Sequence, residues 1–324
     1  MKHFKIYISL IIIMLVACTA CKRNDSNVIP PASTSNQEQT NATQPTSEPT
    51  TNEPTQGPTD APTQKPTDAP TQAPTQSPTQ PPTQGPTQSE NTDFSSITNE
   101  SISFWYSRGQ RNELGQPISA VNFQEQYGQY ADFIKGNDKV IYLTFDEGYE
   151  NGFSGKILDT LKEKNVKAVF FVTLDFATRE PELVRRMIAE GHIIGNHSCK
   201  HPAKGMPSLS TQGHIDDVMK LHNYVLTNFG YEMKLFRHPA GIYSERSFAI
   251  LDSLGYRSVF WSFAHADWYV DNQPSVQTTL DRTTGELHNG AIYLLHAVSE
   301  SNTNALAQFI DNARAKGYEF GKYY

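Results

Sequence analysis

Proline recurs at every fourth position from Pro54 to Pro86, nearly always followed by Thr-Gln or Thr-Asp. Residues 22 to about 95 are mainly Pro, Thr, Gln, Ser and Asn, and such a segment cannot bury enough apolar surface to offset its ordering entropy. We therefore expect a disordered stalk over residues 22–100, extended as polyproline II and reaching on the order of 100 Å. A proline-rich ligand for a partner domain is the alternative, but no basic or aromatic flank marks a docking site. Any hydrophobic core is then confined to residues 101–324.

The first 21 residues are typical of an export signal. A basic start over residues 1–5 precedes an apolar run over residues 6–17, which is too short to span a ~30 Å hydrocarbon core. The run ends Leu-Val-Ala-Cys, which resembles the bacterial lipobox and makes Cys18 the expected lipidation site. Cleavage after Ala20 as an ordinary signal peptide, or lipidation of Cys21, are the alternatives. We expect a protein that is exported and anchored by its lipid to the outer face of the cytoplasmic membrane.

Charge and cysteine content exclude two classes of protein. Residues 1–100 hold 5 Lys and Arg against 9 Asp and Glu, and residues 101–324 hold 22 against 25. Neither part has the basic excess of a nucleic-acid binder, so we expect no nucleic-acid partner. Cys199 is the one cysteine of residues 101–324, which excludes a disulfide framework. We expect a monomer.

From residue 101 onwards, short apolar runs alternate with segments of helical periodicity. The expected strands are Val140–Phe145, Ala168–Thr173, His192–Gly195, Lys234–Phe236, Ser258–Ser262 and Ala291–Leu295. The expected helices are Lys156–Lys164, Glu180–Ala189, Thr211–Asn228, Ser244–Leu254, Ser275–His288 and Asn304–Lys316. This alternation predicts βαβ units around a parallel sheet, and about 220 residues suit one (β/α) barrel. Residues 101–137, which include Trp105 and Tyr106, are expected to pack on the barrel rather than to cap a groove.

Ionisable residues follow several of these strands, where the sites of α/β proteins gather. Asp146 and Glu147 end one strand, and one acid can serve as a base while the other binds a cation. His197 and His201 are four residues apart, so on a helical turn both imidazoles can bind one metal. Cys199, between them, should then point away from the site.

Three further segments carry candidate groups. Arg237 follows a strand and can hold a carboxylate ionised, and the turn after it can offer a backbone N–H to an oxyanion. Asp267, hydrogen-bonded to His296, would fix the tautomer of the imidazole and raise its pKa. Trp268 taken alone is more typical of a core position than of a sugar platform.

In order and spacing, these segments resemble the NodB-type polysaccharide deacetylases, carbohydrate esterase family 4. The family motifs TFDD, H-S/T-x-x-H, R-x-P-Y, D-x-x-D-W and L-x-H correspond to Thr144–Glu147, His197–His201, Arg237–Ala240, Asp267-Trp268 and Leu294–His296. The resemblance covers about residues 138–320 and is greatest to the delta-lactam-forming peptidoglycan deacetylases that act on muramic acid. It implies a distorted (β/α) barrel that removes N-acetyl groups, most simply from N-acetylmuramic acid of peptidoglycan glycan strands, and releases acetate.

The resemblance also implies roles for the residues. Asp146 would be the general base, His296 the general acid, and Arg237 and Asp267 their positioning partners. The expected ligands of a divalent metal, taken as zinc, are His197, His201 and Glu147. The expected substrate-binding residues are Ala240, Trp268 and Leu294.

Four positions depart from the family pattern. Glu147 replaces the metal-binding Asp and is one methylene longer, which puts direct ligation in doubt. Ala240 replaces Tyr, or Arg in the muramic-acid type, so a side-chain contact to substrate is lost while the backbone N–H remains. His238 replaces a proline, and Ala264 replaces the first Asp of D-x-x-D-W. The alternatives are a chitooligosaccharide or xylan deacetylase on the same scaffold, or a catalytically inactive wall-binding protein.

Overall fold

The computed structural model describes residues 93–324. The signal segment, the lipidation site Cys18 and nearly all of the expected stalk lie outside these residues. The folded chain begins before the expected boundary at residue 101, because Phe94 is 5% exposed and belongs to the main core. Arg246 holds the same segment through hydrogen bonds from its guanidinium to the Ile97 carbonyl at 2.8 and 3.0 Å.

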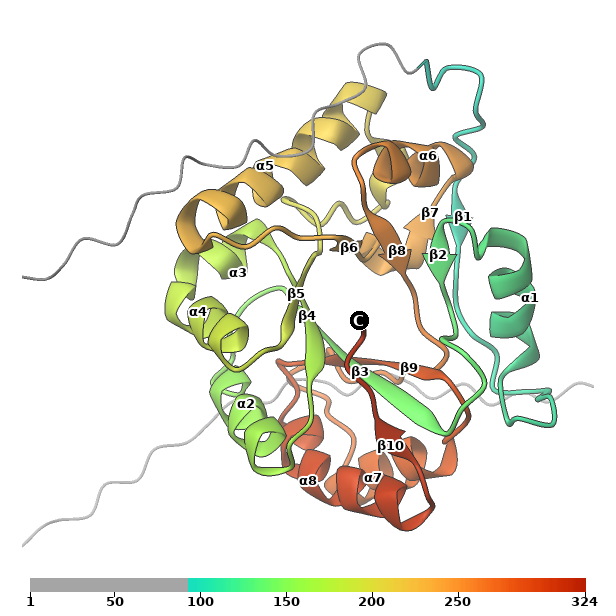
Figure 1. The fold of residues 1–324 in the computed structure, drawn as a ribbon, viewed down its shortest axis with the longest axis vertical. Helices are drawn as coiled ribbons and strands as arrows, with labels where there is room; N and C mark the ends of the chain where they lie inside the picture. The colour runs from blue at the N-terminus through green and yellow to red at the C-terminus, as the bar shows by residue number, and fades with distance from the viewer. Residues whose placement is uncertain (1–92) are drawn as a thin grey trace, which may run out of the picture. The chain divides into compact units, whose positions relative to one another are not determined.

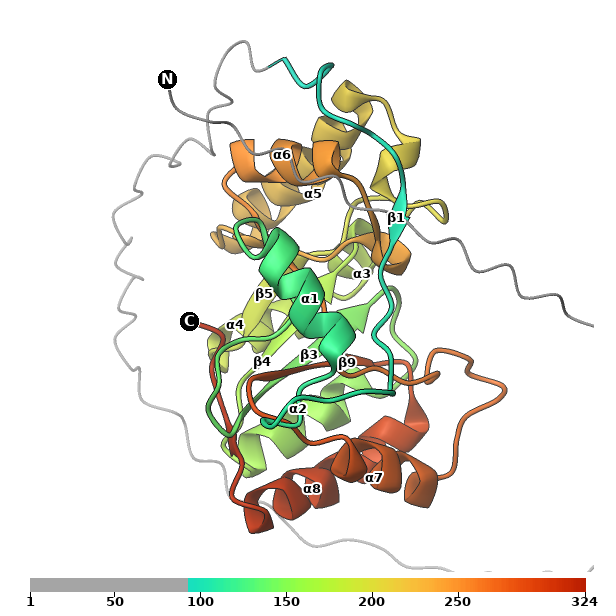
Figure 2. The same ribbon diagram turned by 90° about the vertical axis from the view of Figure 1, so that its right-hand side faces the viewer.

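A curled parallel sheet forms the centre of the fold (Figures 1 and 2). Its neighbouring strands run in the order β9-β3-β4-β5-β6-β8-β2, and β10 pairs with the first residues of β3. Beyond β8, Phe263 forms a parallel bridge to Tyr293 in β9, which brings the two ends of the sheet together as a distorted barrel. The strands of this sheet are β2 (Ala131–Asp132), β3 (Val140–Glu147), β4 (Ala168–Val172), β5 (Ile193–Asn196), β6 (Leu235–Phe236), β8 (Arg257–Val259), β9 (Ala291–His296) and β10 (Glu319–Phe320). The expected (β/α) barrel is confirmed.

Helices cover the outside of the sheet, and most begin at a Ser or Thr cap. Ser210, Ser275 and Ser299 each accept a hydrogen bond from the backbone N–H three residues later. The helices are α1 (Ile118–Tyr127), α2 (Ser154–Glu163), α3 (Leu174–Arg179), α4 (Pro181–Ala189), α5 (Thr211–Phe229), α6 (Glu245–Ser253), α7 (Val276–Gly285) and α8 (Glu300–Ala315). The sequence did not indicate α1, which has no side-chain cap, or the short α3. Within residues 93–324, no helix is long and apolar enough to span a membrane.

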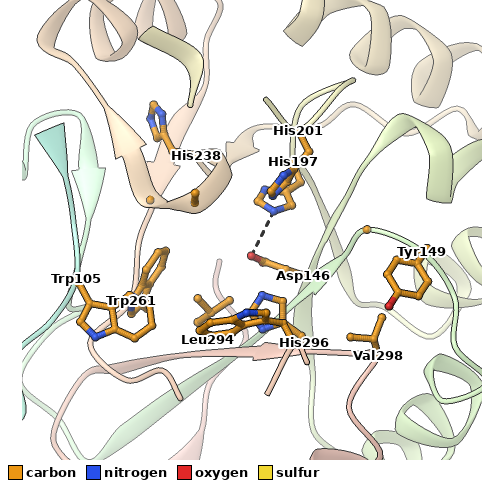
Figure 3. A pocket seen from close by; sticks show the side chains of 14 residues that line it. Trp105, Asp146, Tyr149, His197, His201, His238, Trp261, Leu294, His296 and Val298 are labelled. Carbon is orange, nitrogen blue, oxygen red and sulfur yellow. Dashed lines mark ion pairs between the residues drawn. The ribbon is translucent and has the colours of Figure 1, made fainter. Parts of the chain in front are cut away.

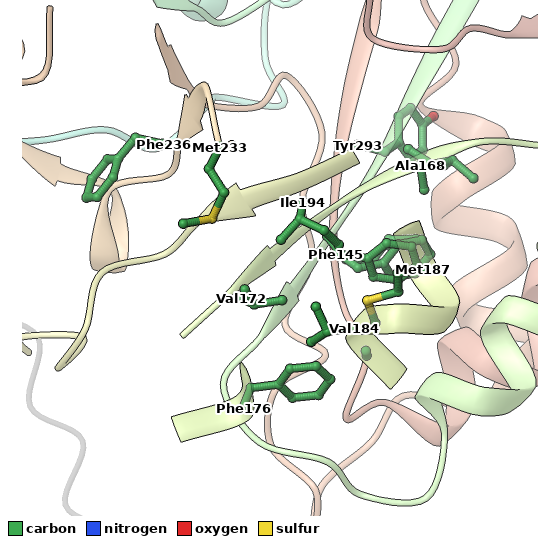
Figure 4. Close-up of a cluster of buried hydrophobic side chains, with 14 of the residues drawn as sticks. Phe145, Ala168, Val172, Phe176, Val184, Met187, Ile194, Met233, Phe236 and Tyr293 are labelled. Carbon is green, nitrogen blue, oxygen red and sulfur yellow. The ribbon is translucent and has the colours of Figure 1, made fainter. Parts of the chain in front are cut away.

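Alternate residues of the strands face two different cores, as the period of two requires. Phe145 and Ile194 point outward and pack under the helices in the main core (Figure 4), to which Phe170 also belongs. Phe171 and Ile292 face the inside of the barrel. A Cβ on Gly195 would lie 2.4 Å from the Phe171 ring, so the interior is closely packed there. This alternation decides which polar side chains at the strand ends enter the barrel mouth.

A short antiparallel ribbon lies beside the barrel. β1 (Ile102–Ser103) pairs with β7 (Ile242–Tyr243), which follows the turn Pro239–Gly241. The chain before the first helix is thereby attached to the strand-end loop that follows Arg237.

Candidate active site

A pocket of about 440 Å³ lies at the carboxyl ends of the strands (Figure 3). Asp146 lies at its centre, with His197 and His201 on one side and His296 and Leu294 on the other. Further lining residues include Trp105, Tyr149, Ala240, Trp261 and Trp268. The structure therefore brings together nearly all residues that the sequence selected, and the exceptions are described below.

Asp146 is held by a buried arginine. Nη1 of Arg237 donates to Oδ1 of Asp146 at 3.0 Å and to Oγ1 of Thr144 at 2.7 Å. Its Nε and Nη2 donate to the carbonyls of Val259 and Phe260, both at 3.1 Å, and the side chain has no exposed surface. Burial alone would raise the pKa of Asp146, but the positive charge of Arg237, together with its hydrogen bond, holds this pKa below its usual value. Asp146 is thus an ionised carboxylate in the pocket, as a general base requires.

The two histidines approach each other without a helix. Ser198 and His201 have φ of 67° and 46°, so the expected helical turn over residues 197–201 is wrong. The loop is shaped instead by Asp217 of α5, whose carboxylate accepts from the N–H groups of Cys199 at 2.7 Å and Lys200 at 3.2 Å. The two imidazole centroids are 4.7 Å apart. Cys199 does not line the pocket, and Asp217 is a supporting residue that no sequence pattern indicated.

His197 presents a free lone pair to the pocket. Its Nδ1 lies 2.9 Å from the Arg237 carbonyl, which can only accept, so Nδ1 carries the proton. Burial lowers the pKa of His197 to about 4, so the ring is neutral at neutral pH and its Nε2 is an acceptor. Nε2 faces Oδ2 of Asp146 at 3.4 Å, and its lone pair is available within the pocket to a cation beside Asp146. Burial also lowers the pKa of His201, which keeps the second imidazole available as a ligand.

Glu147 does not join the histidines. It follows Asp146 in β3, so its side chain leaves the opposite face of the sheet, and it does not line the pocket. Oε2 accepts from the hydroxyl of Ser154 at 3.2 Å, while Oε1 has no partner. Burial, with the nearby charge of Glu150, raises the pKa of Glu147 well above its usual value, as expected for a carboxyl group enclosed away from the pocket. Across residues 93–324, no three His, Cys, Asp or Glu side chains are grouped to hold a metal ion.

The second acid–imidazole pair lies across the pocket from the histidines. Asp267 is 1% exposed, and its Oδ1 lies 2.7 Å from Nδ1 of His296, while Oδ2 accepts from the His296 backbone N–H at 2.9 Å. Burial lowers the pKa of His296, but the charge of Asp267 and its hydrogen bond outweigh this and raise it. The amide of Asn302 donates to Asp267 and was not indicated by the sequence. His296 can thus hold a proton at the Nε2 that the pocket exposes.

The turn after Arg237 and the aromatic side chains complete the lining. Ala240 is exposed to the pocket in a left-handed conformation with φ of 54°, and Leu294 lies on the far side. Trp268 is 36% exposed and contacts the His296 ring, so it is not a core residue. His238 is buried, with Nε2 3.1 Å from the Ser258 hydroxyl. Trp105 also lines the pocket, so packing on the barrel was the wrong expectation for this residue, although the buried Tyr106 does pack.

Comparisons with known proteins agree with this geometry. Residues 134–259 match the family model described as polysaccharide deacetylase. The peptidoglycan-N-acetylmuramic acid deacetylase PdaA of Bacillus subtilis is 38% identical over 228 residues, which are 69% of this chain and 85% of that protein. The chain belongs to the polysaccharide deacetylase family. It is therefore a hydrolase that acts on the N-acetyl groups of a polysaccharide.

Solved structures extend the likeness to the fold. The structure of Bacillus subtilis PdaA, a family 4 carbohydrate esterase, has a TM-score of 0.64 at 37% identity and covers 69% of this chain and 95% of its own. A family 4 carbohydrate esterase from Bacillus anthracis has a TM-score of 0.56 at 37% identity and covers 70% of this chain and 95% of its own. A pseudoenzyme of the same family, also from Bacillus anthracis, has a TM-score of 0.55 at 26% identity, covering 59% of this chain and 66% of its own.

Proposed function

We propose that this protein hydrolyses the N-acetyl group of N-acetylmuramic acid in peptidoglycan and releases acetate. The observation that carries the proposal is the placement of two acid–base groups with opposite protonation states across one pocket. Asp146 is ionised and can take a proton, while His296 is paired with a buried carboxylate and can give one. The muramic acid specificity rests on the similarity to PdaA.

Metal dependence is general in this family, and the residues present fit a divalent cation such as zinc. His197 and His201 would hold it through imidazole nitrogens, whereas the carboxyl group of Glu147 accepts a hydrogen bond from Ser154 at the start of α2 and lies apart from them. A bound divalent cation supplies an activated water and polarises the carbonyl of the acetamide.

The chain's own residues account for the proton transfers. Asp146 takes a proton at its carboxylate from the water that attacks the acetyl carbonyl carbon, and Arg237 keeps this carboxylate ionised and oriented. The backbone N–H at Ala240 would hold the oxyanion that forms. His296 gives its Nε2 proton to the sugar nitrogen as the C–N bond breaks, so the products are acetate and a free amine. Asp267 orients His296 for that step.

We also propose that the catalytic domain works outside the cell on a tether. A signal segment over residues 1–21, Cys18 as lipidation site and the proline-rich segment to about residue 93 would anchor it to the membrane. Glycan strands of the cell wall are the polymer within reach. Labelling with a radioactive or clickable fatty acid, in the natural protein and in Cys18→Ser, tests the anchor: loss of label and release into the medium are expected.

A second candidate substrate is N-acetylglucosamine of the same glycan. In the described part of the chain, the side chains that line the pocket include no Lys or Arg, so none pairs with the lactyl carboxylate of muramic acid. Mass spectrometry of peptidoglycan digested with and without the enzyme separates the cases. Loss of acetyl from muramic acid supports the first candidate, loss from glucosamine supports the second, and loss from neither refutes both.

A further inference from the structure

Large apolar side chains that face solvent gather at the mouth of the pocket. Trp105 is 53% exposed, Tyr149 49% and Trp268 36%, and all three line the pocket. Tyr269 is 56% exposed, and its ring centroid is 5.3 Å from that of Trp268. Soluble proteins seldom keep several large aromatic side chains exposed in one place unless a ligand covers them. The proposed hydrolysis uses Asp146 and His296 and gives no role to the exposed ring of Trp105.

Trp105 is held in place by its neighbours in the chain. Phe104 and Tyr106 are 1% and 2% exposed, while the Trp105 side chain between them is half-exposed. The Phe104 N–H donates to the Gly241 carbonyl at 3.0 Å, and the Tyr106 hydroxyl donates to the Ala264 carbonyl at 2.9 Å. The indole is therefore fixed by buried contacts on both sides rather than carried on an unattached loop.

The backbone next to Trp105 packs so closely against the turn at Gly241 that this position requires a glycine. Gly241 has φ of 67°, and a Cβ there would lie 2.9 Å from both the Phe104 carbonyl oxygen and the Trp261 ring. Gly241 belongs to the turn that carries Ala240 into the pocket. The segment with Trp105 and the turn beside the reacting groups are thus joined in one rigid unit.

The exposed indoles of Trp105 and Trp268 lie nearly perpendicular to each other, and Trp268 lies between Trp105 and His296. The centroids of Trp105 and Trp268 are 6.3 Å apart with an interplanar angle of 79°, and Trp268 meets the His296 ring at 5.5 Å. The ring of Trp105 also meets that of Trp261 edge-on, with centroids 6.0 Å apart; Figure 3 labels both side chains at one end of the pocket. Exposed indole faces suit the apolar C–H face of a pyranose ring, while the hydroxyl groups remain in water.

We propose that Trp105 and Trp268 form a binding subsite for the sugar next to the one that is deacetylated. This inference rests on the proposed function, since it requires a glycan strand in the pocket. Trp105 lies outside the family-matched residues 134–259, so the segment before that region would contribute to substrate binding. The subsite makes the enzyme prefer a polymer over a single sugar.

The test measures binding separately from catalysis. In an Asp146→Asn background, calorimetry compares a disaccharide and a tetrasaccharide, both prepared from peptidoglycan with the stem peptides removed. The tetrasaccharide should bind more tightly, and Trp105→Ala should weaken its binding roughly tenfold while the disaccharide changes little. Trp105→Phe should restore most of the difference. Tyr324→Ala removes another exposed aromatic side chain, one that does not line the pocket, and should change neither affinity.

Two outcomes would overturn the subsite. One is that Trp105→Ala binds the tetrasaccharide as tightly as its parent does, and the other is that it weakens the binding of both ligands by the same factor. Thermal unfolding of each variant shows whether a loss of affinity comes from a destabilised fold. If Trp105→Ala is destabilised, the affinity of Trp105→Phe decides the test. Failure of the proposed function is a different result: the natural protein, loaded with zinc, releases no acetate from either fragment, whatever their affinities.

Discussion

Asp267→Asn is the substitution that most directly tests the general acid. It keeps the size of the side chain and removes one negative charge from beside His296. The carboxylate oxygen lies 2.7 Å from Nδ1, and the side chain of Asp267 is fully buried. The positive charge on a protonated His296 has no comparably close partner once this carboxylate is gone.

The magnitude follows from Coulomb's law. Two unit charges about 4 Å apart interact by about 4 kcal/mol at an effective dielectric constant of 20. Since 1.36 kcal/mol corresponds to a factor of ten, the ratio of protonated to neutral His296 should fall roughly a thousandfold. Because His296 is 23% exposed, water screens part of this interaction, and we expect a loss in kcat/KM of about a hundredfold at neutral pH.

The direction of the pH dependence is fixed by the raised pKa of His296. Activity should be lost as pH rises through that pKa, and Asp267→Asn should move the loss to lower pH. The same pair adds stability at pH values below about 6.5, the unfolded value, and this contribution is lost as pH rises through the folded pKa.

The assay is acetate release from glycan fragments across a pH series, with kcat/KM measured at each point. Asn302→Ala is the matched control, since it removes a hydrogen bond to Asp267 and leaves the charge. Asn302→Ala should lower activity, but the pH at which activity is lost on the alkaline side (the alkaline limb) should shift less than it does in Asp267→Asn. An alkaline limb that stays in place in Asp267→Asn, with full activity, would refute the assignment of His296 as the acid.

Three further substitutions test the remaining parts of the site. Asp146→Asn should abolish acetate release while bound zinc, measured by elemental analysis, stays unchanged; undiminished release would remove Asp146 as the base. His201→Ala should lose the metal on dialysis and lose activity with it, so stoichiometric metal in this variant would show that the ligand set is wrong. Arg237→Met should reduce the free energy of unfolding in urea at neutral pH by about 3–5 kcal/mol, because it leaves a buried carboxylate unpaired. Since the pKa of Asp146 is lowered, this difference is present above pH ~4 and should shrink as pH falls through the folded pKa; a constant difference contradicts the pairing.

The barrel and the grouping of the candidate residues in one pocket could be predicted because each depends on a local pattern. The central strands are apolar runs, and the polar residues that follow them gather at one edge of a parallel sheet, as Asp146, Arg237 and His296 do. The order of these residues also matched a known family. Helices α5 and α8 were similarly readable from their apolar periodicity.

The errors come from backbone direction and from distant contacts. Glu147 could have been excluded from the pocket, because successive residues of a strand point to opposite faces. The conformation of the His197–His201 loop depends on Asp217, which is hydrogen-bonded to it from α5 and could not be inferred from spacing. Trp105 reaches the pocket through the pairing of β1 with β7, a contact between segments far apart in the sequence.

The hydrogen bonds of Arg237 link catalytic competence to the completion of folding. Its guanidinium donates hydrogen bonds to β3, to the last residue of β8 and to the residue after it. The bond to Thr144 joins residues 93 positions apart. Contacts of such long sequence separation carry a high loop-closure cost and depend on the assembly of most of the sheet. A partly assembled chain therefore cannot place the Arg237 guanidinium against Asp146 in the buried pocket. Barrel closure and the placement of Asp146 beside Arg237 are in this sense one cooperative event, so we expect no hydrolytic activity from partly folded copies of the protein.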